Sequence, residues 1–330
     1  LALIFGQLSN RESLRDLIVA LEAHHSKCYH LGMGKNVSKS SLARANQDRD
    51  YHIFEEYAYY LVSEARQKCA NHIFKLGGNV YAFDSTTIDL CLSVFWWAKF
   101  RKKKGGIKVH TLYDVETQIP AFFHITEASV HDSKVMIEIP YEPSSYYIFD
   151  RGYSNFKMLY KIHQIEAYFV VRAKKNLGYK SIQWKRRLPK NVLSDASVLL
   201  TGFYPKQYYP EPLRLVKYWD EEQEREFIFI TNAMHISALQ VAELYKNRWQ
   251  VELFFKWLKQ HLKIKRFWGT TENAVRIQIY AAICAYCLVA IIQHDMQLDR
   301  STYEVLQILS ISLTDKTYLR DLFNKTKISK

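Results

Sequence analysis

A run of short apolar segments between about residues 78 and 174 constrains the fold more than any other part of the chain. Three of these segments are typical of strands: "NVYAFDSTTI", "GIKVHTLYD" and "IPAFFHITEAS". The next segment predicts a helix with Asp132 or Ser133 as its cap, in "HDSKVMIEI". A strand, a helix and a strand follow, in "SSYYIFD", "SNFKMLYKIHQI" and "EAYFVVRAK". This order indicates an α/β fold.

Different patterns flank this region. Apolar residues at helical spacing predict an N-terminal helical region over residues 1–75. Residues 176–233 have strand-like runs separated by turns rich in Pro, Asp and Glu, which predicts an all-β insertion. Ser237 and Gln240 then form the S-x-x-Q pattern that begins a long helix. A second domain over residues 76–330, interrupted by the insertion, is therefore expected.

The composition favours a folded chain with a polyanionic partner. Its 330 residues predict one large domain with an insertion, or two domains. Hydrophobic residues make up 48%, which is enough for a sizeable core. Lysine and arginine number 46 against 33 for aspartate and glutamate, a net charge of +13. A surplus of this size favours nucleic acid as the partner.

The cysteines and the most apolar segment argue against two other classes of protein. Five cysteines are few and odd in number, which fits a reducing cytoplasm and not a disulfide framework. Cys284 and Cys287 form a C-x-x-C without a second pair at zinc-finger spacing, so they are expected to be buried thiols. The apolar run around them is 14 residues long, short of the ~20 that a membrane span needs.

Three acidic residues stand out by position. Asp84 ends the first strand, Asp150 ends the fourth strand, and Glu252 lies in the late helix. Sites in open α/β sheets form beyond the carboxyl ends of strands, so the two aspartates meet if their strands are neighbours. Converging carboxylates need a cation between them, and oxygen ligands suit Mg²⁺ or Mn²⁺. Such a site activates water or a 3′-hydroxyl against a phosphodiester. Each aspartate alone could instead be a turn or cap residue.

The late helix, "LYKNRWQVELFFKWLKQHL", combines two stripes. Tyr245, Arg248, Glu252 and Lys259 fall within an arc of roughly 60° when placed on an α-helix. Large apolar residues occupy the neighbouring arc and are expected to pack into a core. The alternative for the polar stripe is a solvated face with ion pairs at i,i+4.

Together these patterns resemble the DDE transposases, which have a ribonuclease-H-like core. The signature Y-x2-R-x3-E-x6-K, formed by Tyr245, Arg248, Glu252 and Lys259, is similar to that of insertion-sequence transposase family four. "AFDST" and "FDRGY" resemble the first and second acidic motifs of that family, and "RFWGTTENAVRIQIY" resembles the sequence after its helix. The resemblance covers most of residues 1–295. It implies a ribonuclease-H-like mixed sheet flanked by helices, with a β-rich insertion before the glutamate.

The resemblance also implies an activity and residue roles. It implies cut-and-paste transposition of a mobile DNA element, with the three acids as catalytic metal ligands. Tyr245, Arg248 and Lys259 are then expected to contact the DNA strand near the cleavage point. Family members carry more N-terminal sequence, which binds the ends of the element. Because this chain lacks an initiator Met, the DNA-binding region over residues 1–75 is expected to be shortened.

Basic and aromatic residues suggest further DNA contacts. Lys102, Lys103 and Lys104 lie in a segment without acidic residues, which predicts a phosphate-binding loop, with a merely solvated loop as the alternative. The resemblance suggests a tryptophan in the insertion that holds a flipped base. Trp184, beside three basic residues, is the candidate, whereas Trp219 is expected in the core.

Three residues near the acids have two interpretations each. Arg151 and Tyr153 follow Asp150 and are expected either to contact DNA or to brace the loop. His131 could assist proton transfer. The alternative for the segment at His131 is a helix start capped by Asp132.

The leading hypothesis is a transposase that cleaves the ends of its element and joins the 3′-hydroxyl to target DNA. A metal-dependent nuclease and a domesticated DNA-binding protein without catalysis are the alternatives, and the presence of all three acids weighs against the second. The expected partners are double-stranded DNA, as terminal inverted repeats and as target, and a second copy of the chain on DNA, since symmetric pairs are the commonest assemblies. No membrane partner is expected. The expected location is the bacterial cytoplasm, at the nucleoid.

Overall fold

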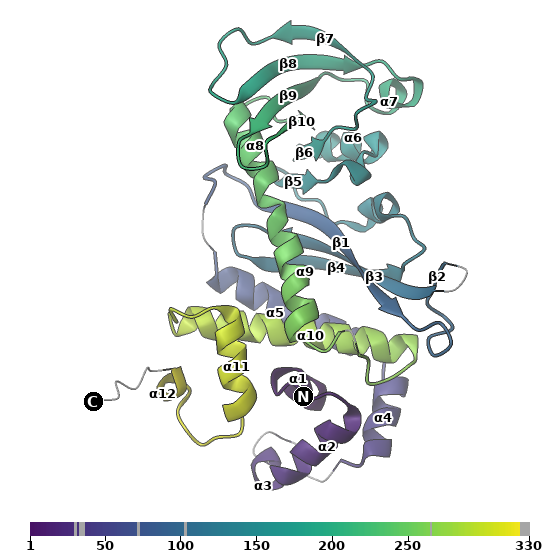
Figure 1. The fold of residues 1–330 in the computed structure, drawn as a ribbon, viewed down its shortest axis with the longest axis vertical. Coiled ribbons are helices and arrows are strands. Elements are labelled where there is room, and N and C mark those ends of the chain that lie inside the picture. Colours follow the sequence, from purple (N-terminus) through teal and green to yellow (C-terminus); the bar gives the residue numbers. More distant parts are fainter. Residues whose placement is uncertain (30–31, 33–36, 71–72, 102–103, 265, 324–330) are drawn as a thin grey trace. The chain divides into compact units, whose positions relative to one another are not determined.

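The protein is a mixed α/β structure in which a long mixed sheet is accompanied by helices (Figure 1). The computed structural model describes residues 1–29, 32, 37–70, 73–101, 104–264 and 266–323. Contacts between residues divide the chain into two compact units. The first unit comprises Leu1–Ala70, Ile88–Ile107 and Phe254–Lys330, and the second comprises Asn71–Thr87 and Lys108–Leu253.

The first unit is mainly helical. Its helices are α1 (Ala2–Leu8), α2 (Leu14–Ala23), α3 (His25–Cys28), α4 (Lys39–Asp48), α5 (His52–Lys68), α10 (Glu272–Asp295), α11 (Thr302–Ser312) and α12 (Leu319–Phe323). Helix α10 is the centre of its core and packs against α5, where Tyr280 donates a hydrogen bond to Glu55. Cys284 and Cys287 are buried on α10, as the sequence predicts.

Helix α10 is longer than the apolar run that marks it in the sequence. Its 24 residues make it long and apolar enough to cross a membrane by length and composition. However, 78% of its most apolar window is buried within the protein. The apolar composition is therefore explained by the core of the first unit, where α10 has other helices on several sides.

The sheet is continuous through the whole α/β part of the chain. Its strands are β1 (Val80–Leu90), β2 (Lys99–Arg101), β3 (Lys104–Asp114), β4 (Ile119–Glu127), β5 (Tyr146–Phe149), β6 (Tyr168–Arg172), β7 (Tyr179–Trp184), β8 (Val192–Leu200), β9 (Leu213–Asp220) and β10 (Arg225–Thr231). Their order is β2-β3-β1-β5-β6-β10-β9-β8-β7, and β4 pairs with β3. The expected insertion therefore contributes β7–β10 as an antiparallel extension of the same sheet.

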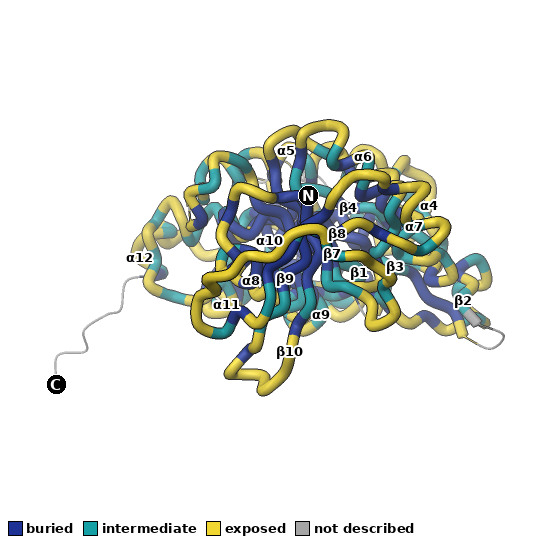
Figure 2. The backbone as a smooth tube through the Cα atoms, turned by 90° about the horizontal axis from the view of Figure 1, so that it is seen from above, coloured by how far each residue is buried: buried dark blue, intermediate teal, exposed yellow. Residues whose placement is uncertain are grey.

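Parallel pairing of β1, β5 and β6 forms the centre of the second unit. β5 pairs in parallel with both neighbours, so the sequence prediction that the first and fourth expected strands are adjacent is confirmed. One face of these strands packs against α6 (Phe156–Gln164). The fully buried residues of this contact include Phe83, Phe149 and Phe169 from the strands and Leu159 from the helix. The other face is covered by α8 (Ala238–Asn247), which contacts β5, β6, β8, β9 and β10. Figure 2 shows the buried strands in dark blue.

A buried ion pair ties the added strands to the start of α8. Arg214 on β9 donates from Nε and Nη2 to the two carboxylate oxygens of Asp195 on β8, over 2.7 and 2.8 Å. Its third nitrogen, Nη1, donates to the carbonyls of Ala233 and Ile236, just before α8. Both side chains of the pair are almost fully buried, so the geometry of β8, β9 and the α8 entrance is fixed together.

Several local predictions need correction. The expected helix after β4 is the 3-10 helix η2 (Asp132–Glu138), and its cap is His131, whose side chain accepts a hydrogen bond from the Ser133 backbone. Asp132 does not cap the helix because its carboxylate bonds to Ser85 and Lys108, which are distant in the chain. The sequence could not reveal these contacts. Trp219 is 40% exposed instead of lying in the core, because it sits near the solvent-facing end of β9. The strand β7 and the short helix α7 (Phe203–Tyr208) were not expected.

The late helix is interrupted where the sequence predicts continuity. The capping box of Ser237 and Gln240 begins α8 as predicted. Helix α8 then ends at Asn247, Arg248 is a turn residue, and α9 (Trp249–His261) begins immediately after it. Arg248 keeps right-handed helical angles, with φ −54° and ψ −31°, and its N–H donates to the Tyr245 carbonyl three residues back, so the interruption lies in the hydrogen-bond pattern.

Candidate active site

The two aspartates emerge where the buried pairing of β1 and β5 stops. Phe83 and Phe149 are the last paired residues of the two strands, and both are fully buried. Asp84 and Asp150 are the next residues along the chain. Because the strands are parallel, their carboxylates lie at the same edge. Strand β1 itself continues past Asp84 to Leu90, so Asp84 ends the pairing with β5 and not, as the sequence suggests, the strand.

A single guanidinium connects Asp84 with the acid on α9. Arg248 donates from Nη1 to Asp84 Oδ2 over 2.8 Å and from Nη2 to Glu252 Oε1 over 2.6 Å. The Arg248 side chain is only 14% exposed. The i,i+4 spacing places Arg248 and Glu252 on one side of the helical segment. The ion pair of the alternative interpretation is therefore present, but Arg248 is not on a solvated face.

Tyr245 makes the corresponding connection to the second aspartate. Its hydroxyl donates to Asp150 Oδ1 over 3.0 Å. Its ring packs against Phe229 of β10, with 4.7 Å between the ring centroids. Burial and the Asp150 charge raise the pKa of Tyr245 to about 12, so the phenol remains a hydrogen-bond donor at neutral pH. All three acids thus accept hydrogen bonds from Tyr245 or Arg248, at the junction of α8 and α9.

The charges of this site are strongly coupled. Burial raises the pKa of Asp84 to about 6, and the Arg248 guanidinium opposes the rise. Glu252 and Asp150 add to the rise, because neighbouring negative charges make ionisation of Asp84 less favourable. Although burial disfavours the charged guanidinium, Asp84 and Glu252 hold the pKa of Arg248 above its ordinary value. Arg248 therefore acts as the counter-ion of the acids.

The donor set suits a hard cation, although the acids are turned toward protein partners. All three candidate ligands supply carboxylate oxygens, which Mg²⁺ and Mn²⁺ prefer. Within the described residues, no group of three or more His, Cys, Asp or Glu side chains is gathered closely enough to hold a metal ion. The reason is visible in the contacts: Asp84 and Glu252 face Arg248, and Asp150 faces Tyr245. A positive group already lies between two of the acids.

Comparison with known families decides what kind of protein carries this site. The model of a family described as the transposase DDE domain matches residues 75–288, which is more than half of the chain. The chain belongs to the DDE transposase family. Residues 1–34 match a second family, described as a domain of unknown function (DUF4372). The predicted membership and the mixed α/β fold with a ribonuclease-H-like sheet are therefore confirmed.

Individual relatives carry names from the same family. A Sinorhizobium fredii protein named as the transposase y4zB is 36% identical over 288 residues, covering 85% of this chain and 78% of that protein. A Geobacillus stearothermophilus protein named as a transposase for insertion sequence element IS5377 is 27% identical over 76% of this chain and 66% of its own length. A Synechocystis protein named for element IS4SA is 25% identical over 88% and 83%. These names are consistent with insertion-sequence family four.

The structure places the other predicted DNA-binding residues of this transposase in different surroundings. Arg151 is exposed at the start of η3 (Arg151–Tyr153), directly after Asp150. Trp184 is 63% exposed on β7, at the end of the sheet. Lys259 is half-buried on α9, in the part that belongs to the first unit. Lys104 is exposed at the start of β3, whereas Lys102 and Lys103 lie outside the described residues.

Two further buried residues, Tyr153 and His110, belong to the surroundings of Asp84. Tyr153 is buried, and its hydroxyl donates to Asp84 Oδ1 over 3.5 Å, which supports the bracing interpretation. His110 on β3 is fully buried beside Thr126, 3.0 Å from its hydroxyl. Burial lowers the pKa of His110 to about 4, so the imidazole is neutral at neutral pH. Sequence patterns held no signal for His110, because a lone histidine in a strand is not distinctive.

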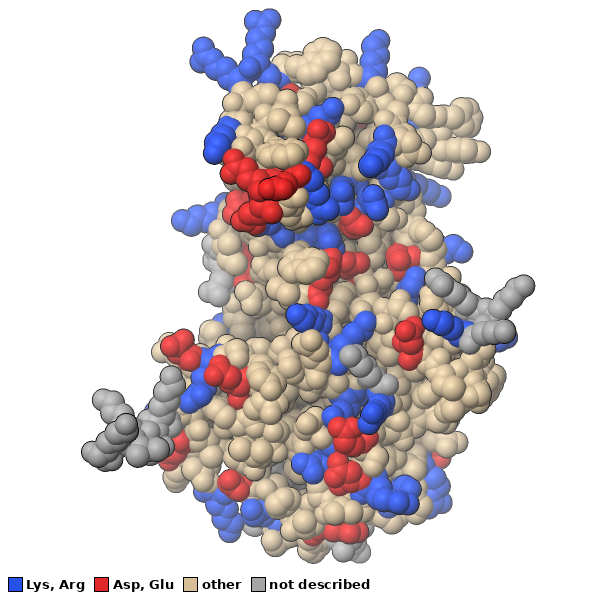
Figure 3. Space-filling view, in the orientation of Figure 1, with Lys and Arg blue, Asp and Glu red and all other residues tan. Residues whose placement is uncertain are grey.

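A cavity of about 780 Å³ opens beside Tyr245 and Arg248. Its walls include aromatic rings and basic side chains, among them Phe227, Trp249, Arg172 and Arg225. Both arginines of β6 and β10 stack on the Phe227 ring, with 4.9 and 4.4 Å from guanidinium carbon to ring centroid. Acidic residues of the β9–β10 turn line its rim, and Figure 3 shows acidic and basic side chains side by side in the upper part of the view.

Proposed function

We propose that this DDE transposase catalyses cut-and-paste transposition of an insertion sequence, by metal-dependent cleavage of phosphodiester bonds followed by strand transfer. The observation that carries the proposal is the connection of Asp84 and Glu252 through Arg248, over 2.8 and 2.6 Å. These residues lie 168 positions apart in the chain (252 minus 84) and come from a strand and a helix. The match to the DDE transposase domain and the names of the relatives support the same function.

Asp84, Asp150 and Glu252 would hold Mg²⁺ or Mn²⁺. The Arg248 guanidinium, which lies between two of these carboxylates, marks a place where a positive charge is favourable. When bound, such metal ions lower the pKa of water or of a 3′-hydroxyl and stabilise charge on the attacking and leaving oxygens. The protein supplies three negative oxygen donors and keeps two of them on rigid neighbouring strands.

Arg248, Tyr245 and Lys259 would bind the phosphates next to the scissile bond. Arg248 presents a planar fork that fits a phosphate, and Lys259 supplies a point charge. Tyr245 orients Asp150 by its hydrogen bond and would contact the DNA strand from the wall of the cavity that it lines. The excess of 46 basic over 33 acidic residues supports DNA as the partner, in the form of the terminal repeats and the target.

The cavity beside Tyr245 and Arg248 would accept an unpaired base. Trp249 is exposed and offers an aromatic face, and base stacking on such a ring contributes about 1–3 kcal/mol per base. Trp184 remains the candidate on the insertion, and it is exposed enough to stack, but it is not among the described residues that line the cavity. The fluorescence of 2-aminopurine, placed at the end of the element, would be measured with Trp249→Ala and with Trp184→Ala. The variant that changes the fluorescence would show which ring holds the base.

The active assembly would be a homodimer on DNA, in the bacterial cytoplasm at the nucleoid. Two identical ends have to be cut together, and twofold pairs are the commonest way of joining identical sites. Residues 1–75 would provide DNA contacts in addition to the catalytic site. Sedimentation of the protein with DNA carrying both ends would show two chains per complex, and full cleavage by a complex with one chain would contradict the dimer.

The experiment that tests the function uses isosteric variants of the three acids. Asp84→Asn, Asp150→Asn and Glu252→Gln keep size but remove one negative charge each, so Mg²⁺-dependent cleavage of DNA with the element's own repeats should be abolished. The folded state and most DNA affinity should persist. Asp89→Asn is the matched control, because Asp89 is exposed on the same strand as Asp84. Near-parental cleavage by the three variants would refute the transposase site.

Strand transfer separates the proposal from a simple nuclease. A DNA end that is already cut, with a free 3′-hydroxyl, should be joined to a target plasmid by the parent chain and not by the three variants. Cleavage without any joining of the pre-cut end would favour the nuclease alternative. A DNA-binding protein without catalysis is not favoured by the relatives, whose names are those of transposases.

A further inference from the structure

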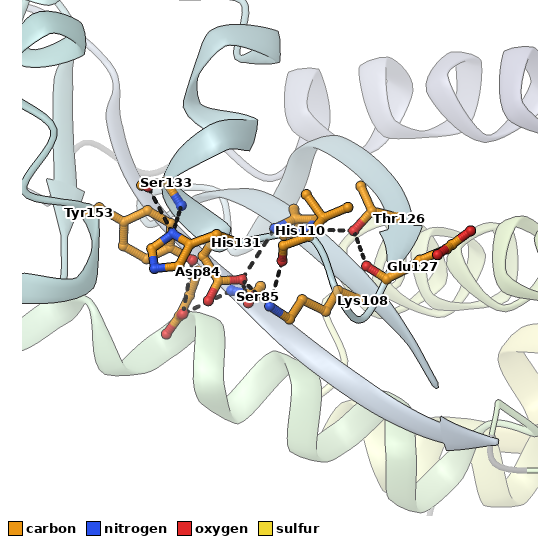
Figure 4. Close-up of polar contacts among 11 residues, drawn as sticks. Asp84, Ser85, Lys108, His110, Thr126, Glu127, His131, Ser133 and Tyr153 are labelled. Atoms are coloured by element: carbon orange, nitrogen blue, oxygen red, sulfur yellow. Dashed lines mark hydrogen bonds and ion pairs between the residues drawn. The ribbon is translucent and has the colours of Figure 1, made fainter. Parts of the chain in front are cut away.

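A second set of polar contacts reaches Asp84 through its other carboxylate oxygen. Arg248 takes Oδ2, whereas the Ser85 backbone N–H donates to Oδ1 over 2.8 Å and the Tyr153 hydroxyl lies 3.5 Å from it. The Ser85 side chain turns away from Asp84 and donates to Asp132 Oδ1 over 2.7 Å. Figure 4 shows the contacts of Asp84 with Ser85 and Tyr153 in one view. The Asp84 carboxylate is therefore anchored through Oδ1, while Oδ2 faces Arg248.

Asp132 is itself fixed by the neighbouring strand β3. Lys108 Nζ lies 3.1 Å from Asp132 Oδ1 and donates to the Val130 carbonyl over 2.8 Å. Only 13% of the Lys108 side chain is exposed, so its charge depends on a partner inside the protein. His110 Nδ1, on the same strand, is 3.8 Å from the same oxygen. Three groups from two strands thus converge on one oxygen of Asp132.

Removing these charged groups from water has a desolvation cost that exposed side chains would not have. Asp132 and Lys108 are held partly or mostly out of water, where an ion pair contributes little to stability by itself. The neighbouring residue His131 already caps η2, so Asp132 is not required as its cap. What the contacts do achieve is a fixed position of Ser85, and with it of the backbone N–H that anchors Asp84.

We propose that Asp132 is a positioning residue of the active site: with Lys108 and Ser85 it fixes the orientation of the Asp84 carboxylate, so that Oδ2 faces Arg248 and the place where a metal ion would replace that contact. This inference rests on the proposed function, in which Asp84 is a metal ligand. Outer partners of metal ligands orient those ligands, and their loss typically costs about 10–100-fold in metal affinity or activity. Asp132 acts through Ser85, so the two residues contribute to one and the same effect.

The test compares Ser85→Ala, Asp132→Ala and the double variant in the full-length chain. Mn²⁺ binding is measured by calorimetry without DNA, cleavage with Mg²⁺, and stability by thermal unfolding. Ser85→Thr keeps the hydroxyl and should restore parental behaviour. Glu138→Ala is the matched control, since Glu138 is an exposed acid at the end of the same η2 and makes no hydrogen bond or ion pair within the described chain.

The expected result is a loss of about 10–100-fold in Mn²⁺ affinity and cleavage for each single variant. The double variant should lose no more than either single one, because both act on the same anchor. Parental Mn²⁺ binding by Ser85→Ala, or multiplied losses in the double variant, would overturn the inference. If Asp132→Ala does not fold because Lys108 is left unpaired, Ser85→Ala against Ser85→Thr decides the question alone.

Asp84→Asn measured in parallel separates this inference from the proposed function. If Asp84→Asn binds Mn²⁺ and cleaves DNA like the parent chain, the proposed function itself fails. If Asp84→Asn is inactive while Ser85→Ala and Asp132→Ala behave like Glu138→Ala, the catalytic assignment stands and only the positioning role of Asp132 is refuted.

Discussion

Removal of the Arg248 side chain should destabilise the free protein and, at the same time, leave its acids more available to cations. Arg248→Ala deletes two charge-assisted hydrogen bonds, to Asp84 and Glu252. Each such bond contributes about 1.5–3 kcal/mol. The side chain of Glu252 is 32% exposed and that of Asp84 is 21% exposed. In the variant, water can therefore solvate these carboxylates and offset part of the lost hydrogen-bond energy. We expect the free energy of unfolding to fall by about 3 kcal/mol at pH 8.

The loss should depend on pH in a definite direction. With its pKa at about 6, Asp84 is ionised at pH 8 and mostly protonated at pH 5. At pH 5 one partner of Arg248 is therefore neutral, and the Arg248→Ala variant should lose less stability than at pH 8. Urea unfolding at the two pH values measures the difference. Lys246→Ala is the control, because its ion pair with Glu222 is exposed and contributes about 0–1 kcal/mol.

Addition of Mg²⁺ completes the test. A ligand that binds only the folded state stabilises it by about 1.4 kcal/mol at ten times its Kd. Because Arg248 competes with cations for the same two acids, Mg²⁺ should stabilise Arg248→Ala more than the parent chain, while cleavage of DNA slows because the phosphate is poorly held. An Arg248→Ala variant that is destabilised no more than Lys246→Ala, or that Mg²⁺ stabilises no more than the parent, would refute this reasoning.

The remaining predictions concern pH, the buried ion pair and the basic loop. The pKa of Asp84 is raised from 3.8 to about 6, so the stability linked to its neutral form is present below 3.8 and is lost as pH rises through 6. Metal-free Asp84→Asn should therefore unfold at higher urea than the parent at pH 8, and a lower midpoint would contradict the sign. Below pH 6, the Mg²⁺ concentration for half-maximal cleavage should rise about tenfold per pH unit, since protons compete with the metal. Arg214→Met should lower the free energy of unfolding by about 3 kcal/mol, because the buried Asp195 loses two charge-assisted hydrogen bonds and keeps only the exposed Lys185 as an ion-pair partner, and calorimetry showing less than ~1 kcal/mol would disprove the anchoring role. Replacing the lysines at 102–104 by alanine should reduce the slope of log K against log salt by about 0.9 for each DNA phosphate that the loop no longer neutralises, and an unchanged slope would exclude the loop.

The sequence was sufficient to bring Asp84 and Asp150 to neighbouring strands, because this placement follows from short-range patterns. An apolar run that ends at an aspartate marks the point where the buried parallel pairing of β1 and β5 stops, although β1 itself continues to Leu90. The i,i+4 spacing of Arg248 and Glu252 likewise needs only helical geometry. Each of these inferences depends on residues within one element, where periodicity carries the information.

What the sequence could not reveal depends on contacts between distant segments. Ser85 and Asp132 are 47 positions apart, and neither has a spacing that predicts their hydrogen bond. The interruption at Arg248 also escapes prediction, because the residue keeps helical angles and only the backbone hydrogen-bond pattern changes there. Strand β7 was missed since both of its faces are largely exposed, so that it lacks an apolar alternation.

The order of strands in the sheet has a consequence for the newly synthesised protein. Asp84 and Asp150 can meet once β5 has been made, but Glu252 lies another 102 residues along the chain (252 minus 150). The strands β7–β10 come between them, and β10 must pair with β6 before α8 has its sheet to rest on. At about 5–20 residues per second, ribosomal synthesis needs on the order of 5–20 s for this stretch. During that interval the nascent chain carries two of its acids without the third, and with the site proposed above it would not yet cleave the DNA that encodes it.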